Sequence, residues 1–268
     1  MLTISGLYIY PIKSLRGISK QSVELTSKGF KYDRQWMLVD QEGQFLSQRI
    51  LPKMALLQPE ETIEGFRIFD IHHQENAIVI PYTVNAAETI SVKVWEDSCT
   101  AVLVGEAYDQ WFSAFLGVPC RLVYMPEEER RLVDPRYAHR NEITTFTDGF
   151  PILMIGQSSL DLLNTKIESK VSIDRFRPNV VFTGGGPHKE DNMLDFEING
   201  IQMHGVKLCA RCTITTIDTQ TAEKQQEPLK TLSFYRKFEN KIMFGQNVIH
   251  DSTGNIKLGD VVRVLKCK

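Results

Sequence analysis

Two cysteines stand close together in the stretch 207–218 (KLCARCTITTID), and their spacing allows several kinds of chemistry. A Cys-x-x-Cys pair is typical of thioredoxin-like redox proteins, but there it opens a helix, whereas the Thr and Ile residues at 213–217 favour a strand. A zinc site normally needs a second ligand pair, and Cys99, Cys120 and Cys267 are scattered. Two ordinary buried cysteines are the remaining alternative.

The local geometry of this pair depends on where the strand begins. If one strand holds both Cys209 and Cys212, a spacing of three places their side chains on opposite faces. Only one thiol would then face a cleft, and the two could not share a metal ion. A turn at Ala210 would remove this restriction, so the spacing leaves the alternatives open.

The same stretch resembles the signature of MOSC-domain proteins that bind the molybdenum cofactor, in particular the amidoxime-reducing members of that family. Three further segments match in the same order: YPIKS at 10–14, YDRQW at 32–36 and FRPN at 176–179. The resemblance implies that Cys212 is the metal ligand and the catalytic residue, and a soft thiolate suits molybdenum. Arg211 is expected to favour the ionised sulfur of Cys212, and Cys209 is expected to be structural.

The resemblance also implies a pocket for molybdopterin, whose phosphate calls for cations or backbone amides. The cofactor-binding residues carried over from the family are Lys13, Ser14, Arg34, Gly149, Phe150, Arg177, Asn179, Ala210 and Arg211. The segment Asp148-Gly149-Phe150-Pro151 corresponds to one that touches the cofactor in relatives. Gly149, Phe150 and Ala210 stand where relatives carry hydroxyl groups, so these three residues would contact the cofactor only through their main chain.

Four of these residues also have a plain structural interpretation. Lys13 would be a solvated lysine at a strand end, Arg34 a partner of Asp33, and Arg177 a partner of Asp174. Asn179 would be a turn residue after Pro178, although its amide can both donate and accept, as a pterin edge requires.

The activity that the resemblance implies is removal of oxygen from the N–O bond of small N-hydroxylated compounds, which yields an amine or amidine and water. The sequence contains no G-x-G-x-x-G turn for a nucleotide and no four-cysteine pattern for an iron–sulfur cluster. Electrons are therefore expected from a separate protein, such as a flavin reductase or a haem or iron–sulfur carrier.

Two other functions fit the same motif. The chain could be a sulfur carrier or sulfurtransferase with a persulfide on Cys212, because related MOSC domains are fused to aminotransferase-like enzymes. Pyridoxal phosphate binding is a further expectation, whereas the cofactor expected for the reaction is the molybdenum cofactor alone. Alternatively, it could carry the molybdenum cofactor without turning over.

Composition limits the partners. A net charge of −2 over 268 residues argues against a nucleic-acid-binding protein. No apolar run approaches the ~20 residues of a membrane span. The first residues, MLTISG, do not resemble a secretory or mitochondrial leader, and five cysteines suit reduced thiols, so a cytoplasmic location is expected.

The hydrophobic pattern predicts a mostly β (α+β) protein with about three helices. The resemblance implies that an N-terminal β-barrel-like domain (1–120) precedes a MOSC β-barrel domain with peripheral helices (121–268). Strands are expected at 6–11, 21–25, 36–39, 66–71, 77–80, 90–95, 122–124, 179–182, 243–246 and 261–265. Helices are expected from about Gly105, after a capping box at 158–161, and over 229–238. The charged loop 127–142, with four arginines, is either a solvated surface or the entrance of a site.

Overall fold

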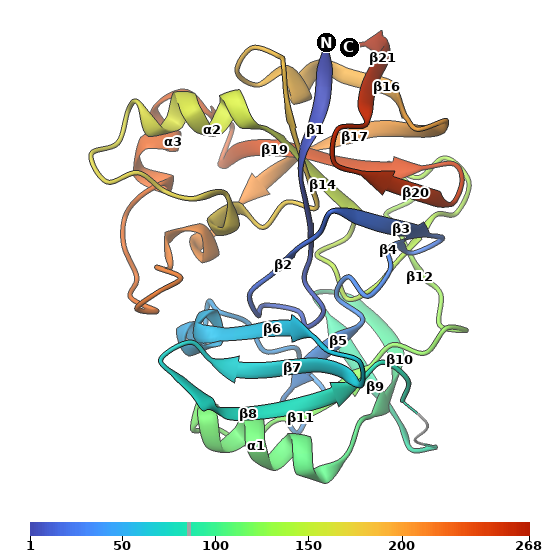
Figure 1. Cartoon of the computed structure of the whole chain (residues 1–268), viewed down its shortest axis with the longest axis vertical. Helices are drawn as coiled ribbons and strands as arrows, with labels where there is room; N and C mark the ends of the chain where they lie inside the picture. Colours follow the sequence, from blue (N-terminus) through green and yellow to red (C-terminus); the bar gives the residue numbers. More distant parts are fainter. Residues whose placement is uncertain (85–86) are drawn as a thin grey trace.

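The first and last strands of the chain are neighbours in one large sheet, which forms the upper part of Figure 1. The computed structural model describes residues 1–84 and 87–268. Pairing of β14 with β19 closes seven strands of this sheet into a barrel. In order, the sheet contains β14 (Ile152–Gly156), β15 (Val180–Thr183), β1 (Leu2–Ile9), β21 (Val261–Cys267), β16 (Met193–Ile198), β17 (Ile201–Arg211), β19 (Lys241–His250) and β18 (Lys237–Phe238), with β2 (Ile18–Ser19) paired to β1.

A second set of sheets forms the lower part of the molecule (Figure 1). One contains β5 (Trp36–Val39), β11 (Arg121–Tyr124), β10 (Asp97–Leu103) and β9 (Thr89–Val94); the other contains β6 (Leu57–Glu61), β7 (Gly65–Asp70) and β8 (His73–Pro81). Helix α1 (Glu106–Leu116) lies below them. A small sheet of β20 (Gly254–Lys257), β3 (Ser22–Thr26) and β4 (Gly29–Phe30) stands nearer the barrel.

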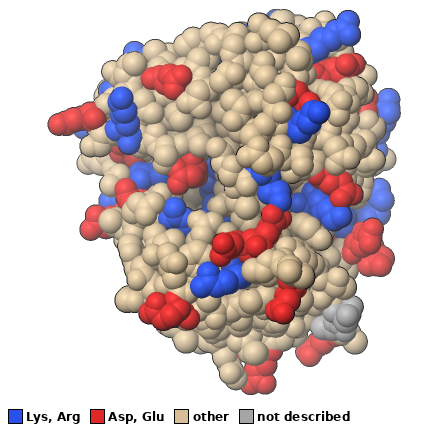
Figure 2. All heavy atoms as spheres, viewed as in Figure 1, with Lys and Arg blue, Asp and Glu red and all other residues tan. Residues whose placement is uncertain are grey.

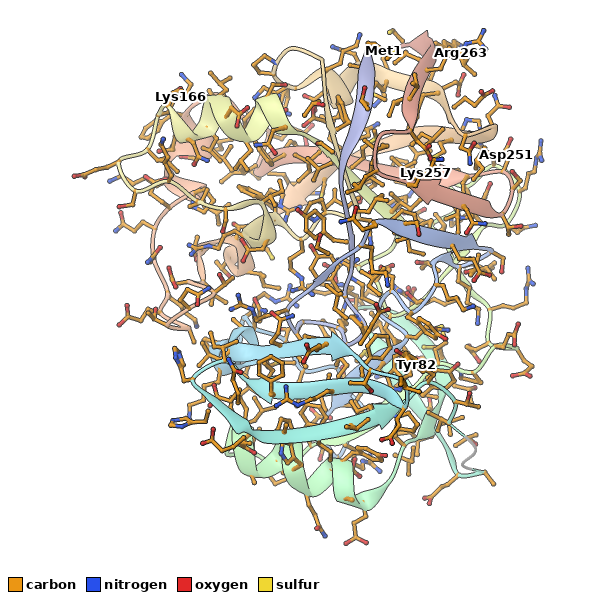
Figure 3. The ribbon with its side chains drawn as sticks, viewed as in Figure 1. Met1, Tyr82, Lys166, Asp251, Lys257 and Arg263 are labelled. Atoms are coloured by element: carbon orange, nitrogen blue, oxygen red, sulfur yellow. The ribbon has the colours of Figure 1, made fainter. Side chains whose placement is uncertain are left out.

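Side chains fill both parts, as Figure 3 shows, with Met1 and Arg263 near the upper end and Tyr82 in the lower part. All four residues of β5 are buried, and Trp36 packs against Phe66 and Tyr124. In β1 buried and partly exposed residues alternate over much of the strand, as expected when one face is covered. The same buried cluster contains residues of both parts, so a continuous core joins them.

The helices agree with the sequence in position but differ in their ends. Gly117 ends α1 in the left-handed conformation (φ 74°), which glycine adopts without steric cost. Helix α2 (Gln157–Asn164) begins after Gly156 without a side-chain cap, so the predicted capping box is wrong: Ser159 lies inside the helix and its hydroxyl donates to Glu190 Oε2 at 2.9 Å. Helix α3 (Leu229–Tyr235) ends three residues earlier than predicted, because 237–238 pair as β18.

The charged loop contains one short pairing, between β12 (Arg131–Leu132) and β13 (Ile143–Thr144). Arg131 is buried and donates to the carbonyls of Thr145 (2.8 Å) and Thr147 (2.7 Å), so one of the four arginines serves the fold. Its guanidinium also lies 2.8 Å from Asp97.

The predicted fold class is confirmed: strands dominate, and the described residues form three α-helices with four short 3-10 segments, η1 (Pro52–Leu56), η2 (Ile173–Phe176), η3 (Lys189–Asn192) and η4 (Thr213–Thr216). The domain boundary near residue 120 stays a prediction. None of the helices in 1–84 and 87–268 has the length and apolar character that a membrane span requires.

Candidate functional site

Several distant segments of the chain line one cavity of about 230 Å³. Strands β14, β17 and β19 and the loop after β5 all contribute to its wall. On the face shown in Figure 2, basic and acidic side chains gather at the level where the two parts of the molecule meet. The structure brings together all ten residues predicted for the site: Lys13, Ser14, Arg34, Gly149, Phe150, Arg177, Asn179, Ala210, Arg211 and Cys212.

Cys212 lies where β17 ends and the turn η4 begins. The prediction of a strand over 213–217 is therefore wrong. The hydroxyl of Thr215 donates to the Cys212 carbonyl (3.0 Å), and that of Thr216 to the Thr213 carbonyl (2.7 Å). Such local bonds offer the backbone an alternative to a strand, and here they outweigh the β-propensity of the residues.

Cys209 lies within β17, opposite a β-bulge of the neighbouring strand. The pairing of β17 with β19 shifts between Leu208 and Ala210, whose partners are Gln246 and Met243, so the extra residue lies in β19. β17 ends at Arg211 and Cys212 lies beyond it, so the condition that one strand holds both cysteines is not met and their side chains are not restricted to opposite faces. Cys209 and Cys212 are both free, half-buried thiols on the wall of the cavity.

The guanidinium beside Cys212 is not the predicted one. Arg211 Nη1 donates to Cys209 Sγ at 3.1 Å and its Nη2 donates to the Phe176 carbonyl at 2.6 Å. Arg49 Nη1 lies 4.0 Å from Cys212 Sγ. Neighbours in an extended chain point to opposite sides, which explains why Arg211 does not serve Cys212.

Lys13 is a buried lysine, not a solvated one, with 5% of its surface exposed. Its Nζ lies 2.6 Å from Asp148 Oδ1 and 5.2 Å from the centre of the Phe45 ring. Burial lowers the pKa of Lys13 to about 8, although the Asp148 carboxylate opposes the shift. Trp95 Nε1 donates to the same carboxylate oxygen at 3.1 Å.

Arg34 forms the ion pair with Asp33 that the adjacency of the two residues in the sequence suggests. Its Nη1 lies 2.6 Å from Asp33 Oδ2 and 3.2 Å from Asn179 Oδ1, and its Nη2 donates to the Arg177 carbonyl at 3.1 Å. Most of this guanidinium is therefore used within the protein. Arg177 differs from its structural interpretation, because its Nη1 donates to the Leu15 carbonyl (2.5 Å) and not to Asp174.

Two arginines of the cavity wall stack on one buried ring. The Cζ atoms of Arg34 and Arg177 lie 4.1 Å and 4.3 Å from the centre of the Tyr10 ring. Burial, with a further contribution from Arg34, lowers the pKa of Arg177 to about 10, which leaves it charged at neutral pH. Two cations held so close to each other favour an anion beside them.

Three of the predicted residues have a strained backbone. Ser14 (φ 69°), Arg34 (φ 49°) and Arg177 (φ 57°) occupy the left-handed region. Each such residue costs roughly 1–2 kcal/mol, and such outliers cluster at functional sites. Their convergence on one cavity makes it the candidate functional site of the described structure.

Asn179 is held by the protein and has little capacity left for a ligand. Its Oδ1 accepts from Arg34 Nη1 and from the Leu153 N–H (3.1 Å), and its Nδ2 donates to the Tyr8 carbonyl at 3.3 Å. Among the described residues this leaves one amide N–H without a partner. A contact of Asn179 with a ligand would therefore be a donated hydrogen bond.

Sequence reasoning missed several side chains of the cavity, among them Phe45, Ser47, Arg49 and Lys207. Lys207 could have been predicted, because it stands two residues before Cys209 in the sequence. Its Nζ lies 4.5 Å from the centre of the Tyr137 ring. The segment 45–49 carried no comparable pattern. Within the part of the chain that the structure describes, Ser47 Oγ and Arg211 Nε are buried without a hydrogen-bond partner.

These features define a β-barrel protein with a cationic cavity next to two thiols. Among residues 1–84 and 87–268, six lysine and arginine side chains and one carboxylate, that of Asp148, line it. Such a cavity suits an anionic ligand that also takes a sulfur donor.

Comparison with known proteins gives the family. Residues 1–119 match the MOSC N-terminal beta barrel domain and residues 141–263 match the MOSC domain. Mitochondrial amidoxime-reducing component 1 of Homo sapiens is 31% identical over 98% of this chain and 83% of its own length; that of Mus musculus is 29% identical over 98% and 82%. Molybdenum cofactor sulfurase of Danio rerio is 30% identical over 94% of this chain, which spans 32% of that protein. The chain belongs to the MOSC family, as the resemblance of its motifs predicted.

Proposed function

We propose that the chain is a molybdenum-cofactor-dependent reductase that cleaves the N–O bond of small N-hydroxylated compounds, with electrons from a separate protein. The observation that carries the proposal is the position of Cys212 on a cavity with six cations. The relatives named for amidoxime reduction cover nearly the whole chain, which supports the same function.

The residues of the cavity fit the molybdenum cofactor. Its phosphate would be held by Lys13 and Arg177, whose charges face the cavity with few competing acidic groups. The unpartnered Ser47 Oγ and Arg211 Nε are a hydroxyl and a donor that a polar ligand would satisfy. Cys212 would supply the sulfur ligand to the metal.

The protein's own part in the reaction is binding and orientation. When bound, the cofactor supplies the two-electron chemistry that removes oxygen from nitrogen. Arg49 places a positive charge 4.0 Å from the Cys212 sulfur. Lys13 Nζ lies 2.6 Å from Asp148 and, with a pKa of about 8, carries the positive charge at neutral pH that a phosphate requires. Two protons and two electrons are consumed for each N–O bond, and water leaves.

The electron donor would dock beside the mouth of the cavity, on the loop 127–142. Tyr137 of this loop packs against Phe150 on the cavity wall, with ring centres 5.8 Å apart. Arg136 on the same loop is exposed, with 78% of its side chain accessible. The loop carries charged side chains of both signs, so salt would weaken a contact that a partner makes through them.

The test is metal and pterin analysis of the purified chain, followed by reduction of an N-hydroxy substrate with a reduced viologen. Cys212→Ser is expected to lose molybdenum and activity, whereas the matched variant Cys209→Ser keeps most of both. NADH alone is expected to give no turnover. Equal loss in both cysteine variants, with zinc in the protein, would refute the assignment of Cys212.

A sulfur carrier with a persulfide on Cys212 is the second candidate, favoured by the 30% identity to molybdenum cofactor sulfurase. Sulfur transfer needs a reactive thiol but no bound metal, so molybdenum bound to the purified chain would separate the two functions. Bound cofactor without any reduction of N-hydroxy compounds would point to a carrier. We do not extend the proposal to pyridoxal phosphate.

A further inference from the structure

Trp95 stands at a backbone position that normally excludes large side chains. It is the first residue of the two-residue loop between β9 and β10, with φ 59°. Hairpin loops fill such positions with glycine or asparagine, and for a bulky residue a positive φ is a true outlier. An exposed loop tip gains nothing from this strain by itself, so the indole at that place needs another explanation.

The surroundings of the indole connect it to the cavity. Its Nε1 donates to Asp148, its ring packs against Phe45 with ring centres 5.1 Å apart, and the Cζ of Arg49 lies 4.2 Å from its ring centre. Phe45, Arg49 and Asp148 all line the cavity. The indole is thus fixed in orientation by three neighbours at the rim.

Trp95 is nevertheless 45% exposed. Core packing therefore does not explain why three neighbours hold this side chain, because a tryptophan that serves the core would be buried. A rigid aromatic surface that stays open to solvent is a surface for stacking a flat group. The excess of cations in the cavity further disfavours a positively charged ligand and favours a neutral or anionic one.

We propose that Trp95, held by Arg49, Phe45 and Asp148, is a substrate subsite that stacks the flat, uncharged aromatic part of an N-hydroxylated compound at the mouth of the cavity. The proposal rests on the proposed function for the fate of the N–O bond. Stacking of a flat group on Trp95 does not depend on that reaction.

Two amidoximes with the same reacting group test this subsite: benzamidoxime, which has a ring, and acetamidoxime, which has a methyl group. With a reduced viologen as donor, Trp95→Ala is expected to raise KM for benzamidoxime roughly fivefold to tenfold and for acetamidoxime less than about twofold. Trp95→Phe should restore part of the loss. Phe238→Ala is the matched control, because Phe238 is 50% exposed and has Arg236 near its ring (5.7 Å) but does not line the cavity.

A binding measurement separates this inference from the proposed function. Benzamide, a flat neutral molecule with no N–O bond, is expected to quench the tryptophan fluorescence of the cofactor-loaded chain, and Trp95→Phe should abolish the quenching. If neither amidoxime is reduced but benzamide still quenches through Trp95, the reductase function fails and the subsite stands.

Three results would overturn the subsite. The first is absence of quenching by benzamide. The second is an equal fall in kcat for both amidoximes at unchanged KM, which would make Trp95 only a support for Arg49. The third is an effect of Trp95→Ala that appears with a protein donor and vanishes with the viologen, which would make the indole a docking contact for that donor.

Discussion

Replacing Arg34 by glutamine distinguishes an arginine that holds a ligand from one that holds the fold. In the folded chain 12% of the Arg34 side chain and 2% of the Asp33 side chain are exposed, and their charged atoms lie 2.6 Å apart. Asp33 Oδ1 also accepts from the Tyr10 N–H at 2.9 Å. Arg34→Gln would therefore leave a buried carboxylate without its cation.

The expected cost follows from that burial. Removing one member of a buried ion pair costs about 3–5 kcal/mol, because the other charge stays behind without compensation. In a chain of this size each kcal/mol lowers Tm by about 2–4 °C, so Tm should fall by roughly 6–20 °C. Loss of a ligand contact alone would leave the stability of the cofactor-free protein unchanged.

The assay is thermal unfolding of cofactor-free protein for the wild type, Arg34→Gln and the double variant Asp33→Asn/Arg34→Gln. The double variant should regain most of the loss, because it removes the unpaired charge. Lys207→Gln is the control, since Lys207 lines the same cavity and lies over the Tyr137 ring (4.5 Å). An unchanged Tm for Arg34→Gln, together with lost molybdenum, would refute the structural role.

Two further predictions use titrating groups. Because the pKa of Lys13 is lowered to about 8, the affinity of the cofactor-free cavity for sulfate should fall about tenfold between pH 7 and pH 9.5, and Lys13→Gln should remove this dependence in a calorimetric titration. Burial raises the pKa of Glu190 from 4.5 to about 7, so the stability it contributes is complete below pH 4.5 and is lost as the pH rises through 7. Between pH 5 and pH 8 this should lower the free energy of unfolding by roughly 2.5 kcal/mol in wild type and in the exposed control Glu75→Gln, but not in Glu190→Gln; equal slopes in all three would contradict it.

Much of the fold could be predicted because local pattern and packing agree. The strand at 36–39 was found at its observed bounds, since four apolar residues bounded by turn residues fit a strand buried on both faces. Helix α1 was found from its apolar spacing and its flanking glycines. In these segments the local preference and the tertiary environment favour the same structure.

The predictions failed where side chains bond to nearby backbone or to distant charges. The run at 213–217 has the composition of a strand, but its hydroxyls bond within the turn. The role of Arg49 could not be found, because its proximity to Cys212 depends on how the loop after β5 folds against the end of β17. The burial of Lys13 was hidden for the same reason, since its partner Asp148 is 135 residues away.

Asp148 joins the two halves of the proposed site. Its Oδ1 accepts from Lys13 Nζ at 2.6 Å and from Trp95 Nε1 at 3.1 Å. One carboxylate oxygen thus orients both a cation for the cofactor phosphate and the indole at the rim. Although desolvation acts in the other direction, Lys13 and Trp95 lower the pKa of Asp148 below its usual range, so it stays ionised and can accept both bonds. Because the two donors share this acceptor, a shift of Lys13 toward a bound phosphate would also change the hydrogen bond between Asp148 and Trp95. The contact with the cofactor and the contact with the substrate would then be coupled through the side chain of Asp148.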